Sequence, residues 1–340
     1  FFQEAGAIRQ FPMNTHFSLS PEELRTAVQK LDALASAMNQ VLFGKEDLIE
    51  LILTGVLARG HILLEGLPGL GKTELVKGLS KALDITARRV QFTPDLLPGD
   101  ITGTPVLQET DGRKSFVFQE GPVFANIMLA DEINRASPKT QSALLEAMQE
   151  RKVTVMGQSH SLPEPFFVLA TQNPIELEGT YPLPEAQLDR FMFLIEVDYP
   201  TEDEEMRIAR ETTGNRSEEL KHILSGDEII FYQDLVRRVP VPEHIYEYAV
   251  KLVRSTRPSL ETSPEWVKQY VAWGAGPRAV QFLILGAKTR AALQGSYIVR
   301  KEDIDAIVEP VLMHRVVTNF AAESQGLTPR KAVARLAAEV

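Results

Sequence analysis

The hydrophobic positions along the chain change their spacing once, near residue 200. Before it, short apolar runs typical of buried strands alternate with segments in which apolar residues recur every three to four positions, as on one face of a helix. After it, only the helical spacing continues, and no segment has the pattern of a strand. Strands that alternate with helices predict a parallel sheet covered on both faces. We therefore expect an α/β domain followed by an all-helical domain.

The same spacing, together with turn and capping residues, places the individual elements approximately. The expected sheet strands cover residues 61–65, 89–92, 126–130, 166–171 and 191–197. The expected helices before residue 200 cover residues 20–38, 45–58, 73–83 and 137–150, and residues 153–162 are expected to form a hairpin. Ser20, Pro21 and Glu23 form a capping box with a first-turn proline, which is typical of a helix start.

Composition and charge narrow the class of protein. The hydrophobic fraction of 44% and the charged fraction of 24% are those of a globular protein with a sizeable core. The sequence has no cysteine, which excludes disulfides and thiolate metal sites. No apolar stretch approaches the roughly 18 residues of a membrane span. No signal peptide is visible, so we expect a cytoplasmic protein. The net charge of −10 argues against nucleic-acid binding.

The strongest chemical signal is a phosphate-binding loop. Residues 66–73 read Gly-Leu-Pro-Gly-Leu-Gly-Lys-Thr, the P-loop spacing, between an expected strand and an expected helix. Glycines let successive backbone N–H groups converge on phosphate oxygens at the start of the helix. Lys72 is expected to reach the β- and γ-phosphates of ATP, and the Thr73 hydroxyl to bind Mg²⁺. The predicted nucleotide-binding residues here are Gly66, Pro68, Gly69, Leu70, Gly71, Lys72, Thr73 and Glu74.

Two acids follow a buried strand about 60 residues later. Residues 127–130 are apolar and precede Asp131 and Glu132, so a parallel strand delivers both carboxylates to the carboxyl edge of the sheet. Asp131 can hold Mg²⁺ through its water shell, and Glu132 can polarise the attacking water. A second apolar strand ends at Asn173, whose amide can bond the γ-phosphate or that water.

Two arginines are further candidates. Arg190 precedes the last expected strand, and Arg278 follows Pro277 at the start of an expected helix. A guanidinium on the transferred phosphoryl group raises the turnover rate by about 10³- to 10⁵-fold. Each arginine is equally compatible with a surface ion pair, and the spacing does not choose between the two interpretations.

Three longer stretches resemble a known family. Residues 91–101, 131–150 and 170–191 are similar to the signature sequences of MoxR ATPases, and the resemblance extends over roughly residues 35–320. It implies an AAA+ core of αβα type, with a parallel five-stranded sheet, followed by an α-helical lid. The implied domains are residues 20–199 for the core and 200–340 for the lid, after an N-terminal extension at residues 1–19.

The resemblance also implies roles for particular residues. Asp131 and Glu132 correspond to the Walker B pair, Asn173 to sensor 1 and Arg278 to sensor 2. Arg190 corresponds to an arginine finger that acts on a neighbouring subunit's nucleotide. Residues implied to lie beside the adenine are Val41, Phe43 and Gly44. Residues 101–122 correspond to a hairpin inserted in helix 2, and residues 153–162 to the hairpin before sensor 1.

MoxR ATPases resemble chaperones, so the implied activity is Mg²⁺-dependent ATP hydrolysis by a hexameric ring that remodels a protein client. The implied partner is a separate protein with a von Willebrand A domain, and the implied role is maturation of protein complexes or metalloenzymes. A metal-chelatase motor subunit and a nucleic-acid-stimulated AAA+ motor are the alternatives. A signalling GTPase is disfavoured because no Asn-Lys-x-Asp motif is present, and a small-molecule kinase because it does not need the set Glu132, Asn173 and Arg190.

Overall fold

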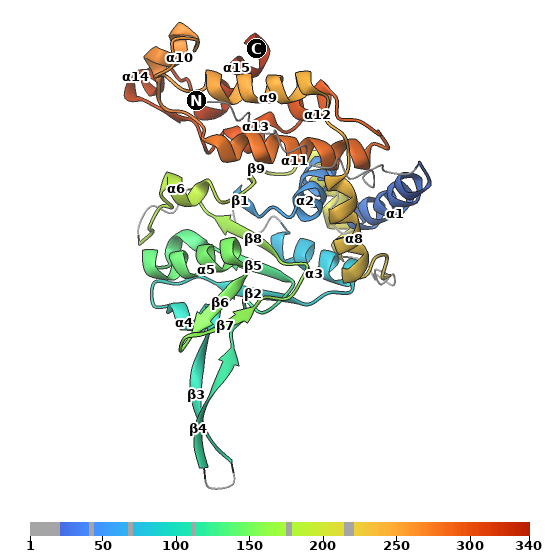
Figure 1. Cartoon of the computed structure of the whole chain (residues 1–340), viewed down its shortest axis with the longest axis vertical. Helices are drawn as coiled ribbons and strands as arrows, with labels where there is room; N and C mark the ends of the chain where they lie inside the picture. The colour runs from blue at the N-terminus through green and yellow to red at the C-terminus, as the bar shows by residue number, and fades with distance from the viewer. Residues whose placement is uncertain (1–20, 41–43, 67–70, 111–112, 175–178, 214–220) are drawn as a thin grey trace, which may run out of the picture.

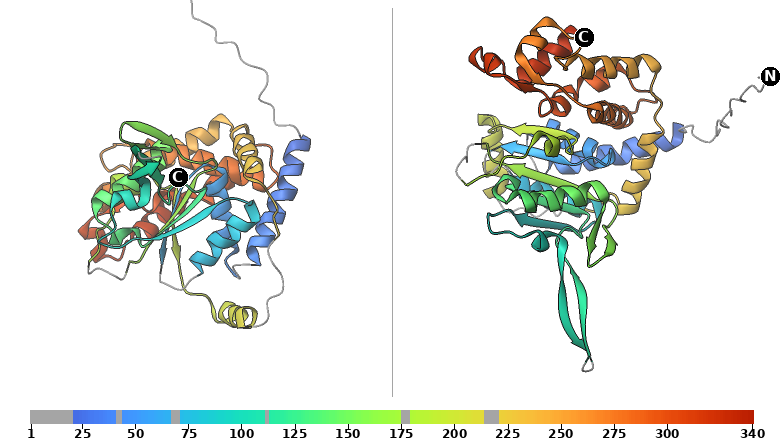
Figure 2. Two further views of the ribbon diagram at one scale, coloured as in Figure 1. Left: turned by 90° about the horizontal axis from the view of Figure 1, so that it is seen from below. Right: turned by 60° about the vertical axis from the view of Figure 1, so that its left-hand side comes forward.

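The computed structural model describes residues 21–40, 44–66, 71–110, 113–174, 179–213 and 221–340. A sheet-containing core lies below a layer of helices, and a long hairpin projects from the core on the side away from that layer (Figures 1 and 2). The upper layer consists of helices from residues 243–339, within the region that the spacing of apolar residues predicted to be helical.

The central sheet has five strands in the order β2-β5-β8-β1-β9, and every neighbouring pair is parallel. The strands are β1 (Ile62–Gly66), β2 (Ala87–Gln91), β5 (Ile127–Asp131), β8 (Phe167–Gln172) and β9 (Phe193–Val197). The parallel five-stranded sheet is therefore confirmed. Strands β5 and β8 are buried almost throughout, because helices cover both faces of a parallel sheet.

Helices cover the two faces of the sheet. The helices of the core are α1 (Pro21–Asn39), α2 (Glu46–Leu57), α3 (Lys72–Leu83), α4 (Pro98–Thr102), α5 (Pro138–Glu150) and α6 (Glu185–Leu188), with a 3-10 turn η1 (Ile133–Arg135). Successive strand residues point to opposite faces. Leu129 accordingly belongs to the cluster that includes Leu75 and Leu79 of α3, whereas Met128 and Ala130 belong to the cluster on α5.

Two antiparallel hairpins extend from the core. The first consists of β3 (Gly103–Thr110) and β4 (Arg113–Glu120), and it is the long projection in Figure 1. The second consists of β6 (Lys152–Val155) and β7 (Gln158–Ser161), which lead into β8. The ring of Phe118 on the first hairpin stacks on His160 of the second, with 4.2 Å between ring centroids. The two hairpins are therefore in direct contact at their bases.

The lid follows β9. Its helices are α7 (Glu202–Thr213), α8 (Gly226–Arg237), α9 (Glu243–Ser255), α10 (Glu265–Tyr270), α11 (Pro277–Leu293), α12 (Lys301–Asp305), α13 (Val308–Leu312), α14 (Phe320–Ser324) and α15 (Pro329–Glu339). The expectation of helices alone after residue 200 needs one correction. Strands β10 (Val271–Trp273) and β11 (Val317–Thr318) form a short antiparallel pair, too short to leave a strand pattern in the sequence.

The lid and the core share one hydrophobic cluster. Helix α11 packs against α1 and α2 of the core as well as against α8 and α9 of the lid. Buried residues of all these helices and of the α3 face of the sheet form a single cluster, which includes Leu31, Ile52, Leu283 and Leu252. Within the described part of the chain, no helix is long and apolar enough to cross a membrane.

Candidate functional site

The first part of the candidate site is the start of α3. Gly71, the residue before this helix, has φ +78°, a left-handed conformation that a glycine adopts without strain. The Lys72 ammonium donates a hydrogen bond to the carbonyl oxygen of Gly66, the last residue of β1, at 3.0 Å. Burial lowers the pKa of Lys72, and the carboxylates of Asp131 and Glu132 oppose that shift. The predicted residues Pro68, Gly69 and Leu70 lie outside the described residues.

A cavity of about 320 Å³ opens between this helix start and the carboxyl ends of the strands. Its lining is Gly66, Gly71, Lys72, Thr73, Glu74, Arg89, Gln91, Asp131, Glu132, Thr171, Gln172 and Asn173. Residues from β1, β2, β5, β8 and α3 therefore meet in one place, as expected for a parallel sheet whose ligands bind at its carboxyl edge. Lys72, Thr73, Asp131, Glu132 and Asn173, predicted from separate motifs, all face this cavity.

The Asp131 carboxylate is held by two side chains from neighbouring strands. Thr171 on β8 donates its hydroxyl to Asp131 Oδ1 at 2.7 Å. Arg89 on β2 contacts Oδ2 through both Nη2 at 2.7 Å and Nε at 3.2 Å. Both carboxylate oxygens are thus paired, and the orientation of the side chain is fixed from two sides.

The Glu132 carboxylate is also held, although differently. Its backbone has φ +56°, unusual for a residue with a side chain, and its N–H donates to the Thr171 hydroxyl at 2.9 Å. The Gln91 amide donates to Glu132 Oε2 at 2.7 Å, and Arg135 lies 3.1 Å from the same oxygen. Two side chains therefore contact the same oxygen of the Glu132 carboxylate.

Asn173 lies just beyond the end of β8 and is buried. Its carbonyl oxygen accepts a hydrogen bond from the Asn134 side chain at 3.4 Å. Because Thr171 and Asn173 are two residues apart on an extended segment, both reach the same side of the sheet and both face the cavity.

The side chains fit a hard divalent cation. Mg²⁺ is held in such sites by one or two protein oxygens, with nucleotide oxygens and water completing its shell. The Thr73 hydroxyl and the Asp131 carboxylate line the same cavity and supply oxygens of this kind. Asp131 is also engaged by Arg89 in this structure, so a cation at Asp131 would compete with that ion pair.

The residues predicted beside the adenine are not part of the phosphate cavity. Val41 and Phe43 lie outside the described residues. Gly44 has φ +68° and lies against Glu204, and it lines a neighbouring cavity together with Val197 at the end of β9. The structure therefore places Gly44 next to the strand that borders β1, beside the phosphate cavity and not within it.

Arg190 lies on the other face of the sheet from the P-loop helix. Its guanidinium donates to the Leu145 carbonyl oxygen of α5 at 2.7 Å. The cavity that it lines is formed by α5, Lys152 and Gln187. Since α3 and α5 cover opposite faces, the structure does not bring Arg190 to the phosphate cavity of its own subunit.

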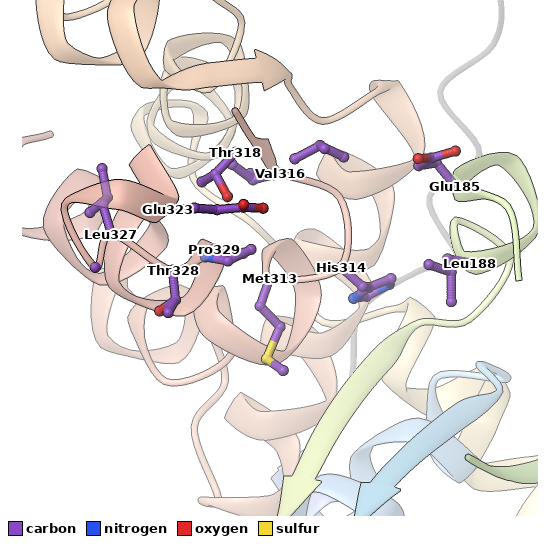
Figure 3. Close-up of a pocket in the computed structure, with 12 residues that line it drawn as sticks. Glu185, Leu188, Met313, His314, Val316, Thr318, Glu323, Leu327, Thr328 and Pro329 are labelled. Atoms are coloured by element: carbon purple, nitrogen blue, oxygen red, sulfur yellow. The ribbon is translucent and has the colours of Figure 1, made fainter. Parts of the chain in front are cut away.

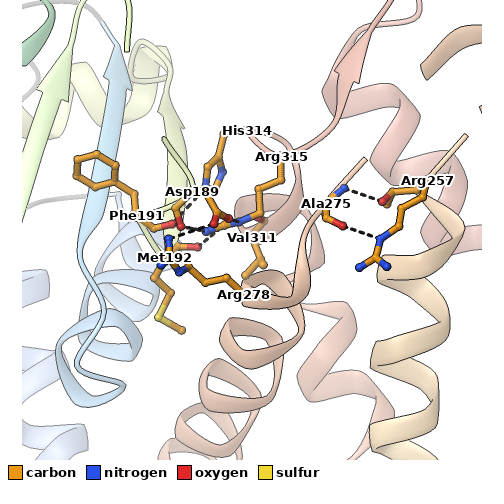
Figure 4. A network of polar contacts seen from close by, with 10 residues as sticks. Asp189, Phe191, Met192, Arg257, Ala275, Arg278, Val311, His314 and Arg315 are labelled. Carbon is orange, nitrogen blue, oxygen red and sulfur yellow. Dashed lines mark hydrogen bonds and ion pairs between the residues drawn. The ribbon is translucent and has the colours of Figure 1, made fainter. Parts of the chain in front are cut away.

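Arg278 also lies outside the phosphate cavity. Its guanidinium contacts Asp189 Oδ2 at 3.1 Å, and the buried Arg315 contacts Asp189 Oδ1 at 2.8 Å (Figure 4). Arg315 further donates to the backbone carbonyl oxygens of Asp189 and Phe191, at 2.9 and 2.6 Å. Burial lowers the pKa of Arg315 to about 10, and Asp189 limits that shift. Two lid arginines therefore share the carboxylate next to Arg190.

The sequence interpretation missed several residues of these networks, among them Arg89, Gln91, Thr171, Asp189 and Arg315. A signal for three of them exists in the strands. Arg89 and Gln91 are polar at alternate positions of an expected strand, and Thr171 is two residues before Asn173. No local pattern identifies Asp189, because its partners come from lid segments 89 and 126 residues away in the chain.

A larger cavity of about 540 Å³ lies at the junction of lid and core (Figure 3). Leu188 of α6 and Met313 and His314 of the lid line it, with Glu185 and Glu323 among the polar residues of the lining. It adjoins the Asp189 network through His314, whose Nε2 lies 3.2 Å from the Phe191 carbonyl oxygen. No P-loop residue that the structure describes lines this cavity.

The parallel sheet of five strands, the P-loop helix and the carboxylates at the ends of β5 define a P-loop ATPase fold of AAA+ type. A family model described as the ATPase family associated with various cellular activities matches residues 61–193, and an AAA lid domain model matches residues 264–336.

Comparison with known proteins specifies the family. Chaperone MoxR1 of Mycobacterium tuberculosis is 41% identical over 315 residues, which cover 93% of this chain and 83% of that protein. Protein MoxR of Paracoccus denitrificans is 30% identical, over 85% of this chain and 88% of its own. The chain belongs to the MoxR family of AAA+ ATPases.

A solved structure agrees with this assignment. The crystal structure of a candidate ATPase from Cytophaga hutchinsonii is 38% identical to this chain and superposes with a TM-score of 0.87, covering 94% of this chain and 96% of that one. The similarity extends over core and lid together.

Proposed function

We propose that this protein hydrolyses ATP with Mg²⁺ and uses the energy to remodel a protein client. The observation that carries the proposal is the single cavity shared by Lys72, Thr73, Asp131, Glu132 and Asn173, which come from separate segments of the chain. A signalling GTPase or a small kinase does not require all of these groups together.

The proposed roles follow from the chemistry of each side chain. Lys72 leaves the Gly66 carbonyl oxygen and binds the β- and γ-phosphates, and the N–H groups at the start of α3 contribute partial positive charge. Thr73 and Asp131 hold Mg²⁺, which neutralises phosphate charge when bound. Glu132 takes a proton from the attacking water. The oxygen of that water bonds to the γ-phosphorus, and the bond between the γ-phosphorus and ADP breaks. Asn173 orients that water.

We further propose that Arg190 and Arg278 act on the nucleotide of a neighbouring subunit. Both lie outside the phosphate cavity of their own subunit, and Asp189 connects the lid residue Arg278 with the segment that carries Arg190. A ring of subunits, with six as the expected number, is the assembly in which such residues reach a nucleotide. A groove between two subunits would then contain both halves of the site.

The biological setting is part of the same proposal. Chaperone naming of a relative supports a remodelling role for this chain. A client in complex or metalloenzyme maturation, a partner with a von Willebrand A domain, and a cytoplasmic location are expectations from the family resemblance and the sequence. The domain limits 20–199 and 200–340 are proposed on the same basis.

Glu132→Gln tests the proposed reaction. The amide cannot take a proton from water, so ATP binding should stay within about threefold of wild type while turnover falls by about 10² to 10⁴. Nucleotide binding is measured with a fluorescent ATP analogue, and turnover by phosphate release.

Glu247→Gln is the matched control, because Glu247 is an exposed glutamate on α9 in the lid. It should leave both binding and turnover unchanged. Turnover by Glu132→Gln at the wild-type rate would remove Glu132 as the base, and failure of the wild-type protein to bind ATP would remove the whole proposal.

A further inference from the structure

Arg89 occupies an unusual position for a cation. It lies on β2, the edge strand of the sheet, two residues before Gln91 and on the same face. Its guanidinium contacts Oδ2 of Asp131, the carboxylate proposed to hold Mg²⁺, through two nitrogens at 2.7 and 3.2 Å. The same group donates to Gln91 Oε1 at 3.1 Å.

A guanidinium and a divalent cation compete for the same carboxylate oxygen. Arginine offers only donors and stays charged, so it cannot complete a metal's coordination shell. A metal ion at Asp131 would also be repelled by the Arg89 charge. The Arg89 contact therefore opposes the binding of Mg²⁺ at Asp131, and bound Mg²⁺ would weaken the Arg89 contact.

The exposure of the two partners indicates which one moves. The Arg89 side chain is 51% exposed, whereas that of Asp131 is 16% exposed. Arg89 can swing into water at little cost, because an exposed ion pair contributes little to stability. Asp131 stays in place, since the Thr171 hydroxyl holds its other oxygen.

We propose that Arg89 is a positioning residue of the magnesium site, which pairs with Asp131 while the metal is absent and releases it when the metal arrives with nucleotide. The inference rests on the proposed function. In the absence of metal, Arg89 compensates the Asp131 charge and leaves a positive group at the cavity that receives phosphates. Removing Arg89 should therefore weaken nucleotide binding in the absence of metal. It should also increase the factor by which Mg²⁺ tightens nucleotide binding.

Arg88 provides a matched control. It is the preceding residue of the same strand, carries the same charge and is exposed, and its side chain points to the opposite face of β2. Arg88→Ala changes the net charge as Arg89→Ala does, without touching Asp131. Any difference between the two variants therefore reports the Asp131 contact and not the loss of charge.

The experiment measures dissociation constants of a fluorescent, non-hydrolysable ATP analogue, once in EDTA and once in excess Mg²⁺. The ratio of the two constants gives the coupling between metal and nucleotide. We expect Arg89→Ala to raise this ratio about 3- to 10-fold over wild type and Arg88→Ala to leave it within about 1.5-fold. Arg89→Lys, which keeps the charge but lacks the two-nitrogen contact, should give an intermediate ratio.

Three outcomes would overturn the inference. An unchanged ratio in Arg89→Ala shows that Arg89 does not compete with the metal. A lower ratio, with weaker binding mainly in Mg²⁺, assigns Arg89 to the phosphates. An equal rise in Arg88→Ala reduces the effect to net charge.

A double variant guards against misfolding as the cause. In an Asp131→Asn background, Arg89→Ala should no longer change the ratio, because the contact that it removes has lost its charged acceptor. Thermal melting shows whether each variant is folded. Wild-type protein that binds no analogue under either condition would overturn the proposed function, whereas binding with an unaltered ratio in Arg89→Ala overturns only this inference.

Discussion

The two groups of charged side chains proposed to act on one ATP are built in different ways. The phosphate cavity gathers residues from the ends of adjacent parallel strands and from the helix that follows β1, all within the core. The second group consists of Asp189, Arg278 and Arg315, next to Arg190, and is called the arginine group below. It forms only where the lid meets the core, because Arg278 and Arg315 reach Asp189 from lid segments. The first group can form in the core alone, whereas the second requires a docked lid.

This difference bears on how a motor of this kind could transmit force. A change in lid position would alter the Asp189 contacts before it altered the network around Asp131, since the latter has no lid partner among the contacts described for it. If Arg190 and Arg278 act on a neighbour's nucleotide as proposed, the arginine group is where a lid movement and that nucleotide would influence each other. The predictions below separate the two groups, beginning with the largest expected effect.

Arg190→Ala should lower the turnover rate by about 10³-fold or more, while affinity for ATP stays within about twofold. The reason is that the guanidinium is proposed to act on the transferred phosphoryl group of a neighbour and not on bound nucleotide in its own subunit. Turnover and binding are measured across protein concentrations, with native mass spectrometry on the same samples. Lys152→Ala, which alters a cation lining the same cavity as Arg190, is the control.

The result distinguishes the two groups directly. Loss of ATP affinity in Arg190→Ala would indicate that Arg190 contributes to the phosphate cavity of its own subunit. Full activity of a wild-type monomer, independent of concentration, would remove the neighbour from the mechanism.

Lys72→Ala should reverse that pattern, with ATP affinity reduced by about 100-fold and assembly unchanged. The ammonium is proposed to make charge-assisted hydrogen bonds to two phosphates, each of them stronger than a neutral one. Lys77→Ala, on the same helix but paired with Glu74 at 2.8 Å on the surface, should bind ATP normally. Equal affinities of the two variants, measured by titration, would contradict a phosphate-binding role for Lys72.

The sequence predicted that the residues of the phosphate cavity would lie together, because they follow local rules. The P-loop is contiguous, and Asp131, Glu132 and Asn173 each follow an apolar strand of an all-parallel sheet, so their meeting at one edge could be expected from topology. The five strands were placed within one or two residues for the same reason. Residues of neighbouring strands that contact Asp131, such as Arg89 and Thr171, were not predicted, because the order of strands in a sheet cannot be read from the spacing of residues.

The arginine group shows where such prediction ends. Arg190 and Arg278 were found as candidates only from their motifs, and the spacing left them equally compatible with surface ion pairs. Asp189 and Arg315 were not found at all, because long-range packing of α11 and α13 on the core determines their contacts. The small β10–β11 sheet was missed for a related reason, since strands of three and two residues are defined by their partner and not by a pattern.

Asp189→Asn should lower the free energy of unfolding by about 3–5 kcal/mol, because it removes the carboxylate that compensates a buried guanidinium. Arg315 is 2% exposed, whereas Arg278 is 38% exposed. Arg278→Ala removes a half-exposed partner and should cost about 1 kcal/mol or less. Urea denaturation measures both variants. ATP affinity should be unaffected in each, which would separate lid docking from phosphate binding.

Equal destabilisation by the two variants would show that Asp189 is held mainly by Arg278. A stable Asp189→Asn protein would mean that the four backbone carbonyl oxygens around Arg315, those of Asp189, Phe191, Met192 and Val311, suffice to hold its charge.

The smallest expected effect compares one buried histidine of the core with one of the lid. His61 precedes β1, and its pKa is lowered to about 4, first by burial and then by Arg151. His314 lies beside Asp189's network, and burial followed by the charge of Arg315 lowers its pKa well below the usual value. Because each folded-state pKa lies below the unfolded value of about 6.5, the unfolded chain binds more protons below that pH. The contribution of these two histidines to the free energy of unfolding is therefore constant above about pH 6.5, and it falls as the pH drops toward their folded-state pKa values.

Between pH 7 and pH 5.5, each buried histidine should cost about 1 kcal/mol of unfolding free energy. His61→Gln and His314→Gln should each remove that share of the loss, and His244→Gln, an exposed histidine on α9, should not. Urea denaturation at the two pH values measures the difference. A loss that stays the same in both buried variants would mean that neither histidine changes its protonation on unfolding.

The two variants should differ at pH 7, which sharpens the comparison between the regions. The Val168 N–H donates to His61 Nδ1 at 3.0 Å, and His61 Nε2 lies 3.3 Å from the Met148 carbonyl oxygen, so both ring nitrogens are bonded. In His314, Nε2 contacts Phe191, while the buried Nδ1 has no hydrogen-bond partner in the described part of the chain. His61→Gln should therefore lose about one hydrogen bond more, roughly 0.5–1.5 kcal/mol, at a pH where neither histidine titrates. Equal costs at pH 7 would mean that the second hydrogen bond of His61 adds nothing measurable to stability. The site of His61 in the core would then be no more demanding than the site of His314 in the lid.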